Sequence, residues 1–183
     1  MPIPYNSVSI ANNFLESYGA DAGIEHMKLQ KLVYCAYGWW LAHAKLEGQR
    51  LTSDGPEIWK HGPVFPDLYH AFKVFGRKPI KQMQSTNPFS DPENVDANDL
   101  QVRPLVAWIW GRYGHLSSFD LSEMTHKQGT PWYRVAQERG FSVPMSTRIP
   151  DQYILEEFSS LMVTEQQRQT QAPQPNADRA ANI

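Results

Sequence analysis

Histidine and cysteine are the side chains of this chain best suited to bind a metal or attack a substrate. No two histidines form an H-x-x-x-H pair, and the single cysteine lies at ligand spacing from none of them. We therefore predict no metal site and interpret the histidines as structural or surface residues; they are His26, His43, His61, His70, His115 and His126. Cys35 lies between Tyr34 and Ala36, and this apolar setting predicts a buried thiol rather than a nucleophile.

Acid–base chemistry would need paired carboxylates held in different environments. Several acidic residues instead gather in a polar stretch that we expect to be solvated, at Asp91, Glu93, Asp96 and Asp99. The G-x-S-x-G, P-loop and G-x-G-x-x-G fingerprints are absent. We predict no enzyme activity and no cofactor. The alternative is a hydrolase-type enzyme that uses His61, His70 or His126 with a carboxylate, and a buried His–carboxylate pair would reveal it.

The densest aromatic stretch is Trp59–Phe72, which also contains rigid backbone. Gly62 can adopt a positive φ and Pro63 fixes φ, so the pair predicts a specific turn. Pro66 suits the first turn of a helix that ends near Gly76. Glu57-Ile58-Trp59 before the turn is compatible with a short strand, which makes a β-hairpin possible.

Helical periodicity dominates the rest of the chain. Leu29, Leu32, Val33, Ala36 and Trp40 form one stripe of a central helix, and further apolar residues predict that it is enclosed on more than one side. We expect further helices from Ser7 to Gly19, near Pro104, after Ser117 or Ser118, from Thr130-Pro131 to Gly140 and from about Asp151. Residues 77–83 could pair as a strand, and 84–98 read as an exposed loop.

The predicted fold is mainly α: a single compact helical domain over residues 5–163. Beyond Thr164 the chain is rich in Gln, Ala and Pro, so we expect a disordered polar tail over 164–183. No apolar run approaches the roughly 20 residues of a transmembrane helix, and the N-terminus does not resemble a secretion signal. We expect a cytoplasmic protein without membrane contact.

The charge distribution bears on nucleic-acid binding. Lys73, Arg77, Lys78 and Lys81 form a local basic cluster, which we interpret as a solvated helix end facing the C-terminal dipole. With a formal net charge of −2 and a pI near 6.3, the composition argues against a nucleic-acid partner. A DNA-binding autoregulator is nevertheless kept as a second alternative.

The six tryptophans exceed what a minimal core needs. Trp40 and Trp108 lie on the apolar stripes and are expected in the core, whereas Trp39 and Trp110 lie off them. Buried aromatic anchors dominate protein interfaces. We therefore predict a partner-binding surface formed by Trp39, Trp59, His61, Phe65, Tyr69 and Trp110.

Three segments together resemble one protein family. They are Lys28-Leu29-Gln30-Lys31-Leu32-Val33-Tyr34 with Gly38-Trp39, then Trp59-Lys60-His61-Gly62-Pro63-Val64 with Leu68-Tyr69, and then Thr125-His126-Lys127-Gln128-Gly129-Thr130-Pro131-Trp132. Their order and spacing resemble the SocA-like, or Panacea, antitoxin domain, which also occurs in phage-associated proteins of the GepA type. The resemblance covers roughly residues 5–160.

The resemblance implies a mostly helical antitoxin that binds and neutralises a co-encoded protein toxin. The protein that gives the family its name delivers its toxin to a ClpXP-type protease, so the resemblance also implies such delivery as a possible role here. It identifies no particular toxin, and the 84–98 loop and the tail are candidates for setting that choice. We assign the shared motif residues an architectural role; these are Lys28, Leu32, Gly62, Pro63, Thr125, His126, Gly129, Pro131 and Trp132. Thr125 and His126 are expected to hydrogen-bond to backbone at a helix end.

Overall fold

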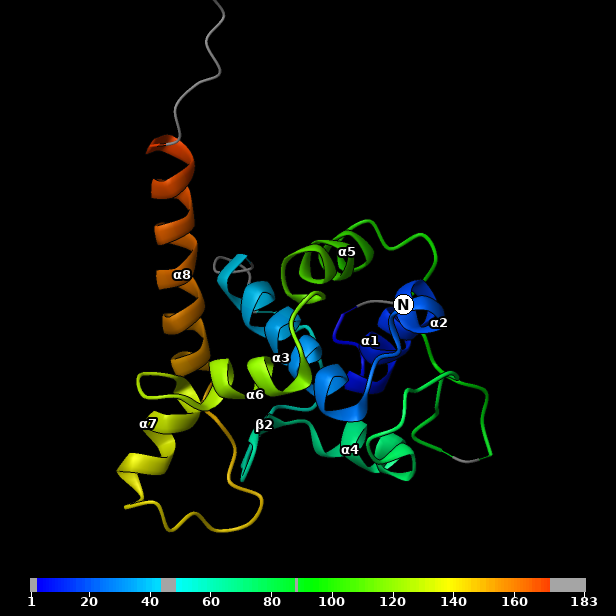
Figure 1. Cartoon of the computed structure of the whole chain (residues 1–183), viewed down its shortest axis with the longest axis horizontal. Coiled ribbons are helices and arrows are strands. Elements are labelled where there is room, and N and C mark those ends of the chain that lie inside the picture. Colours follow the sequence, from blue (N-terminus) through cyan, green and yellow to red (C-terminus); the bar gives the residue numbers. More distant parts are fainter. Residues whose placement is uncertain (1–2, 44–48, 88, 172–183) are drawn as a thin grey trace, which may run out of the picture.

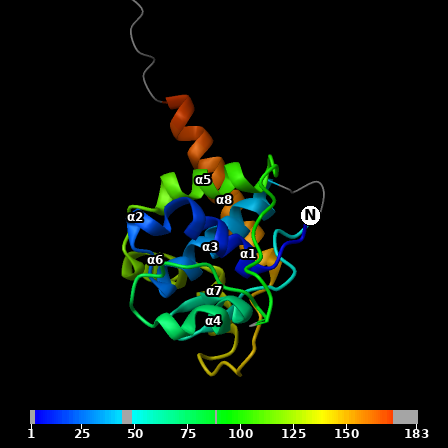
Figure 2. The same ribbon diagram turned by 90° about the vertical axis from the view of Figure 1, so that its right-hand side faces the viewer.

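The central helix of the fold is α3 (His26–His43), which other elements surround (Figures 1 and 2). The computed structural model describes residues 3–43, 49–87 and 89–171. Helix α3 packs against α1 (Ser7–Phe14), α4 (Pro66–Phe72), α5 (Val102–Tyr113), α6 (Ser118–His126), α8 (Asp151–Gln171) and strand β2 (Gly62–Val64). The prediction of a helix enclosed on more than one side is confirmed, as is the mainly α fold.

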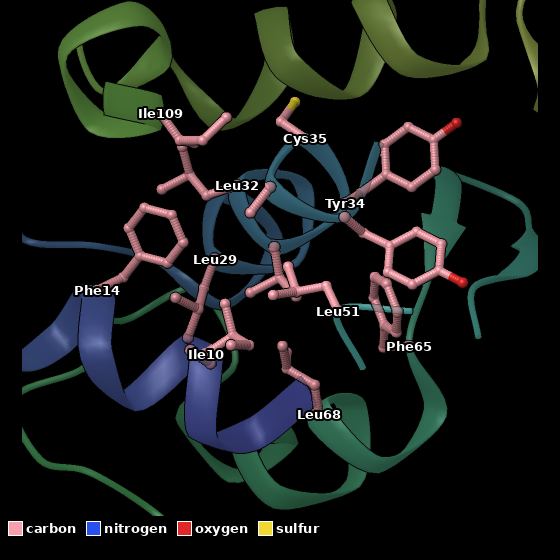
Figure 3. Close-up of a cluster of buried hydrophobic side chains, with 14 of the residues drawn as sticks. Ile10, Phe14, Leu29, Leu32, Tyr34, Cys35, Leu51, Phe65, Leu68 and Ile109 are labelled. Carbon is pink, nitrogen blue, oxygen red and sulfur yellow. The ribbon is translucent and has the colours of Figure 1, made fainter. Parts of the chain in front are cut away.

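Apolar side chains from several elements meet around α3 (Figure 3). Leu29 and Leu32 of α3 are fully buried, and the side chains near them come from α1, α4 and α5. Cys35 is buried in the same core. Because these side chains approach α3 from different directions, its apolar residues cover more than one stripe, as burial on several sides requires.

The N-terminal helical region differs from the prediction at both ends. Asn6, not Ser7, is the N-cap of α1, and its side chain accepts a hydrogen bond from the Val8 amide at 2.7 Å. Gly19 does not end the helical path, which continues through the π-helical segment η1 (Leu15–Gly19) and α2 (Ala20–Ala22). Gly23 ends it in the left-handed conformation, with φ 59°.

The hairpin is confirmed: β1 (Glu57–Trp59) pairs antiparallel with β2, and Trp59 lies opposite Gly62. Helix α4 begins at Pro66 as expected and continues into the 3-10 turn η2 (Lys73–Phe75). The expected strand at 77–83 is wrong. Two backbone hydrogen bonds hold that segment instead, from Lys78 N to Phe75 O and from Ile80 N to Ile24 O. The predicted loop over 84–98 is confirmed apart from residue 88, which lies outside the described ranges.

The helix starts of the second half follow local capping rules, as predicted. Helix α5 carries Pro104 in its first turn. Ser117 caps α6 through a capping box with Asp120. Thr130 caps α7 (Pro131–Glu138), and its side chain accepts from the Tyr133 amide. Short polar side chains therefore fix where α6 and α7 begin.

Helix α8 begins at Asp151 as expected, but it corrects the predicted tail boundary. We expected disorder from residue 164, whereas the helix continues to Gln171 and projects beyond the other helices (Figures 1 and 2). Glu and Gln are good helix formers, and Glu165 forms an ion pair of 2.6 Å with Arg112 of α5. The remainder of the expected tail, 172–183, lies outside the described residues. Within the described chain, no helix has both the length and the apolar character needed to cross a membrane.

Candidate partner-binding groove

Lys31 is a buried cation at the centre of the three motif segments. Its side chain is 1% exposed, and Nζ donates to the carbonyl oxygen of Pro63 at 2.9 Å. Among the described residues no carboxylate lies within ion-pair distance of it. Burial lowers the pKa of Lys31 to about 7. An ammonium group with so few partners inside a protein is costly and needs an explanation.

Gly62 allows the hairpin to approach Lys31 closely. Its φ is +99°, and a Cβ placed there would lie 2.8 Å from Nζ of Lys31 and 3.1 Å from Oγ1 of Thr125. A side chain at this position would therefore be strained in the backbone, would collide with Lys31 Nζ and would crowd Thr125 Oγ1. The glycine predicted as a turn residue is also a contact residue.

Gln30 fixes the chain that follows the hairpin onto α3. Its Nε2 donates to the carbonyl of Phe65 at 3.2 Å, and its Oε1 accepts from the Phe65 amide at 3.0 Å. Both groups are buried, so the pair satisfies polar atoms that would otherwise be unpaired. Sequence reasoning missed Gln30 and Lys31 as site residues. The available signal was two polar residues at the start of a helix that becomes apolar on all sides.

The third motif segment joins α6 and α7 to the hairpin. Trp132 Nε1 donates to the Trp59 carbonyl at 2.7 Å, and Ser122 Oγ donates to the His61 carbonyl at 2.9 Å. Thr125 Oγ1 donates to the Leu121 carbonyl at 2.9 Å, and His126 Nδ1 contacts the Ser122 carbonyl. The expected backbone hydrogen bonds of Thr125 and His126 are confirmed.

Two adjoining hollows lie on the surface over these contacts, and we call them together the groove. The inner hollow, of about 270 Å³, is lined by His26, Lys31, Trp59, Tyr69 and neighbouring residues. The outer hollow, of about 700 Å³, is lined by polar residues and by Phe119, which is 69% exposed. Met27, His61 and Gly76 line both hollows. The groove therefore lies between α3, the hairpin, α6 and the turn after α4.

His26 supplies a second unusual group in the inner hollow. Its Nε2 is buried and has no hydrogen-bond partner. Burial, and secondarily the nearby Lys31 charge, lowers the pKa of His26 to about 4, so the ring is neutral at pH 7. The ring centroids of His26 and Tyr69 are 5.2 Å apart, and those of Tyr69 and Trp59 are 4.7 Å apart. The inner hollow thus combines the polar ring nitrogen of His26 with the aromatic rings of Tyr69 and Trp59.

The structure divides the predicted partner-binding residues. Trp59, His61 and Tyr69 line the groove together. Trp39 and Phe65 are buried, so neither presents a surface to a partner. Helices α5 and α8 cover Trp39: its Nε1 donates to the Tyr113 hydroxyl at 2.9 Å, and its ring meets Phe158.

Of the two tryptophans of α5, one lies outside the groove and the other departs from the stripe assignment. Trp110 is half-buried and lies outside the groove, where it stacks on Tyr18 at 4.5 Å with an interplanar angle of 7°. Trp108, expected in the core, is 41% exposed. The burial predicted from the stripes was therefore the reverse of the observed burial for Trp39 and Trp108. The reason is that α3 is covered on both faces, whereas α5 is covered on one.

The remaining motif residues have structural contacts, in line with the role we assigned them. Lys28 Nζ donates to the Gly114 carbonyl at 2.6 Å and lies 5.3 Å from the centroid of the Trp110 ring. Leu32 is fully buried in the core. Gly129 has φ +92° before the α7 cap, and Pro131 occupies the first turn of α7. These contacts fix the helices that frame the groove.

The described residues of the groove do not include the histidine–carboxylate pair that the hydrolase-type alternative requires. Among the described residues, no histidine forms a hydrogen bond or ion pair with a carboxylate, and no three His, Cys, Asp or Glu side chains are grouped to hold a metal. Burial raises the pKa of the Cys35 thiol far above its usual range, which disfavours the thiolate that nucleophilic attack requires. The groups that line the groove include N–H donors, aromatic rings, the exposed Phe119 and, in the outer hollow, the carboxylates of Glu25 and Glu123.

Comparison with known proteins agrees with this arrangement of motifs. The family model described as "Antitoxin SocA-like, Panacea domain" matches residues 29–133, which include most of α3, the hairpin, α6 and the start of α7. Over 166 residues the chain is 29% identical to "Antitoxin SocA" of Caulobacter vibrioides (strain NA1000 / CB15N), spanning 86% of this chain and 84% of that protein. No solved structure matches the chain significantly. The chain belongs to the SocA-like antitoxin family, as a Panacea domain.

Proposed function

We propose that this protein is a cytoplasmic antitoxin without catalytic activity, which neutralises a co-encoded protein toxin by binding it through the groove. The observation that carries the proposal is the convergence of all three family motif segments on one hollowed surface. That surface contains exposed or half-exposed aromatic rings and one buried ring nitrogen without a partner, Nε2 of His26. Aromatic groups in desolvated pockets are the usual anchors of protein interfaces.

Phe119 supports the choice of this face. It lies in the first turn of α6, is 69% exposed and lines the outer hollow. Burial of a phenylalanine side chain contributes about 1.5–3 kcal/mol to association when it is removed from water. A partner that covers the groove would bury this side chain together with Trp59 and Tyr69.

The test is co-expression with the neighbouring reading frame of the same operon. We expect the neighbour alone to arrest growth, and co-expression of this protein to restore growth and to co-purify with the neighbour. Growth arrest that this protein fails to relieve, together with no co-purification, would refute the proposed function.

Matched variants locate the interface. Phe119→Glu places a charge in the groove, whereas Phe141→Glu places the same charge at another exposed phenylalanine, 60% accessible and outside the groove. We expect Phe119→Glu to lose toxin binding and growth rescue while Phe141→Glu keeps both. Equal rescue by the two variants would place the interface elsewhere.

Delivery of the bound toxin to a ClpXP-type protease extends this proposal and rests on the family resemblance. Its measurement is the half-life of the toxin in cells with and without this protein, and with and without the protease. A toxin half-life that the protein leaves unchanged would limit the antitoxin to occluding its target.

A further inference from the structure

The inner hollow contains more hydrogen-bond donors than the protein itself satisfies. Lys31 Nζ carries three N–H bonds when protonated, and its one described acceptor is the Pro63 carbonyl at 2.9 Å. His26 is 8% exposed, and its buried Nε2 has no partner. Both side chains line the same hollow. Buried polar groups in folded proteins nearly always have a partner, so the unpartnered Nε2 of His26 beside the singly bonded Nζ of Lys31 indicates an acceptor supplied from outside.

The surroundings restrict what that acceptor can be. The walls are the rings of Trp59 and Tyr69, whose centroids are 4.7 Å apart, together with Val64. A volume of about 270 Å³ lies just below the usual size of a cofactor or drug-sized ligand site, but it accommodates an amino-acid side chain. A short apolar stem ending in acceptor oxygens fits both the aromatic walls and the donors.

We propose that the inner hollow binds the carboxylate of an acidic side chain presented by the toxin, with Lys31 Nζ and His26 Nε2 as its donors and the Trp59 and Tyr69 rings against its stem. This assignment rests on the proposed function, because it names the chemistry by which the same groove recognises its partner. The outer hollow then receives the chain on either side of the acidic residue. Phe119 and His61 line that outer part.

Charge complementarity favours a carboxylate over a neutral amide. The charged residues that line the inner hollow are Lys31 and Lys60, whereas the carboxylates of Glu25 and Glu123 line only the outer one. The Glu57 carboxylate lies beside the aromatic wall, where it accepts from Trp59 Nε1 at 3.1 Å. Burial lowers the pKa of Lys31 to about 7, so a carboxylate brought to Nζ stabilises the ammonium and raises that pKa. His26 is neutral at pH 7, and it donates to the carboxylate in the tautomer that carries its proton on Nε2. A glutamine side chain offers one carbonyl oxygen and no charge.

The experiment follows the side-chain NMR signals of His26 and the lysine Cε groups in the full-length protein. The titrants are N-acetyl-glutamate N-methylamide, its glutamine analogue as the uncharged control, and N-acetyl-alanine as a probe with a main-chain carboxylate, all at matched ionic strength. We expect the glutamate probe to shift the His26 and Lys31 signals, and the glutamine probe to leave them unchanged.

Two variants test whether the shifts arise in the hollow. Lys31→Met keeps the length of the stem and removes the donor, and His26→Leu removes the second donor; a native amide spectrum shows that each variant is folded. Shifts from the glutamate probe should disappear in both. Against the co-encoded toxin, each variant should weaken binding by about tenfold or more, since a charged hydrogen bond is lost.

The possible outcomes separate the two proposals. Equal shifts from the glutamate and glutamine probes, or no shift at His26 and Lys31 in the wild-type protein, overturn the carboxylate assignment. Shifts from N-acetyl-alanine alone overturn the choice of a side-chain carboxylate in favour of a chain terminus. The probes need no toxin, so a failure of the antitoxin function would appear separately, as growth arrest that the wild-type protein does not relieve.

Discussion

Replacing Gly62 with alanine tests the close approach of the hairpin to α3. The residue has φ +99°, where an L-residue costs on the order of 1–3 kcal/mol. The added Cβ would also lie 2.8 Å from Lys31 Nζ and 3.1 Å from Thr125 Oγ1. Nζ cannot retreat freely because it is buried and bonded to the Pro63 carbonyl. Overpacking of this kind adds about 1–3 kcal/mol, so we expect a total loss of roughly 2–6 kcal/mol.

The control for this prediction is Gly129→Ala. Gly129 has a similar φ of +92°, but a Cβ there would meet nothing within 4 Å. The control therefore carries the backbone strain without the collision, and the difference between the two variants measures the contact with Lys31 and Thr125. Urea unfolding of the full chain, followed by two probes to check two-state behaviour, gives both free energies. Equal losses in the two variants would refute the reasoning that Lys31 lies rigidly beneath Gly62.

Two further predictions concern packing and protonation. A Cβ on Gly38 of α3 would overlap the Phe158 ring of α8, so Gly38→Ala should destabilise the fold by about 1–3 kcal/mol. Gly111 lies on the open side of α5, so Gly111→Ala should stabilise the fold by about 0.5–1 kcal/mol. Thermal unfolding measures both changes, and a Gly38→Ala variant as stable as the wild type would contradict the α3–α8 contact. Because the pKa of Lys31 is about 7 when folded and 10.5 in the unfolded chain, only the unfolded state keeps the proton between these values. Between pH 7 and pH 10, the unfolding free energy of the wild type should therefore rise relative to that of Lys31→Met, by at most about 1.4 kcal/mol per pH unit. If the unfolding free energies of the two proteins changed with pH in parallel, the low pKa of Lys31 would be contradicted.

Elements governed by local rules were predictable from the sequence. The caps at Ser117 and Thr130, Pro104 in a first helical turn and the Gly62-Pro63 hairpin all lie where local backbone chemistry places them. Each of these signals acts within a few residues of the chain. The prediction of a strand at 77–83 failed because the backbone hydrogen bond from Ile80 to Ile24 is a tertiary contact that strand propensity does not describe.

The groove itself depended on contacts between distant segments. Lys31 reads as a solvated residue in an amphipathic helix start, but the hairpin about thirty residues later covers it. Trp39 lies off the main stripe and is buried because α8 supplies a second packing surface. The continuation of α8 beyond Thr164 likewise includes a tertiary contact, the Arg112–Glu165 ion pair with α5. Which of these distant residues contact one another cannot be predicted from a single sequence.

Hydrogen–deuterium exchange of the protein with and without its toxin tests the central claim most directly, namely that the groove is the surface that binds. We predict that toxin binding slows amide exchange most in the segments that line the groove, at residues 60–62, 76–77 and 118–123. The exposed loop at 84–98 and the projecting end of α8 should change little. Protection confined to that loop or to α8, with the groove segments unchanged, would contradict the account.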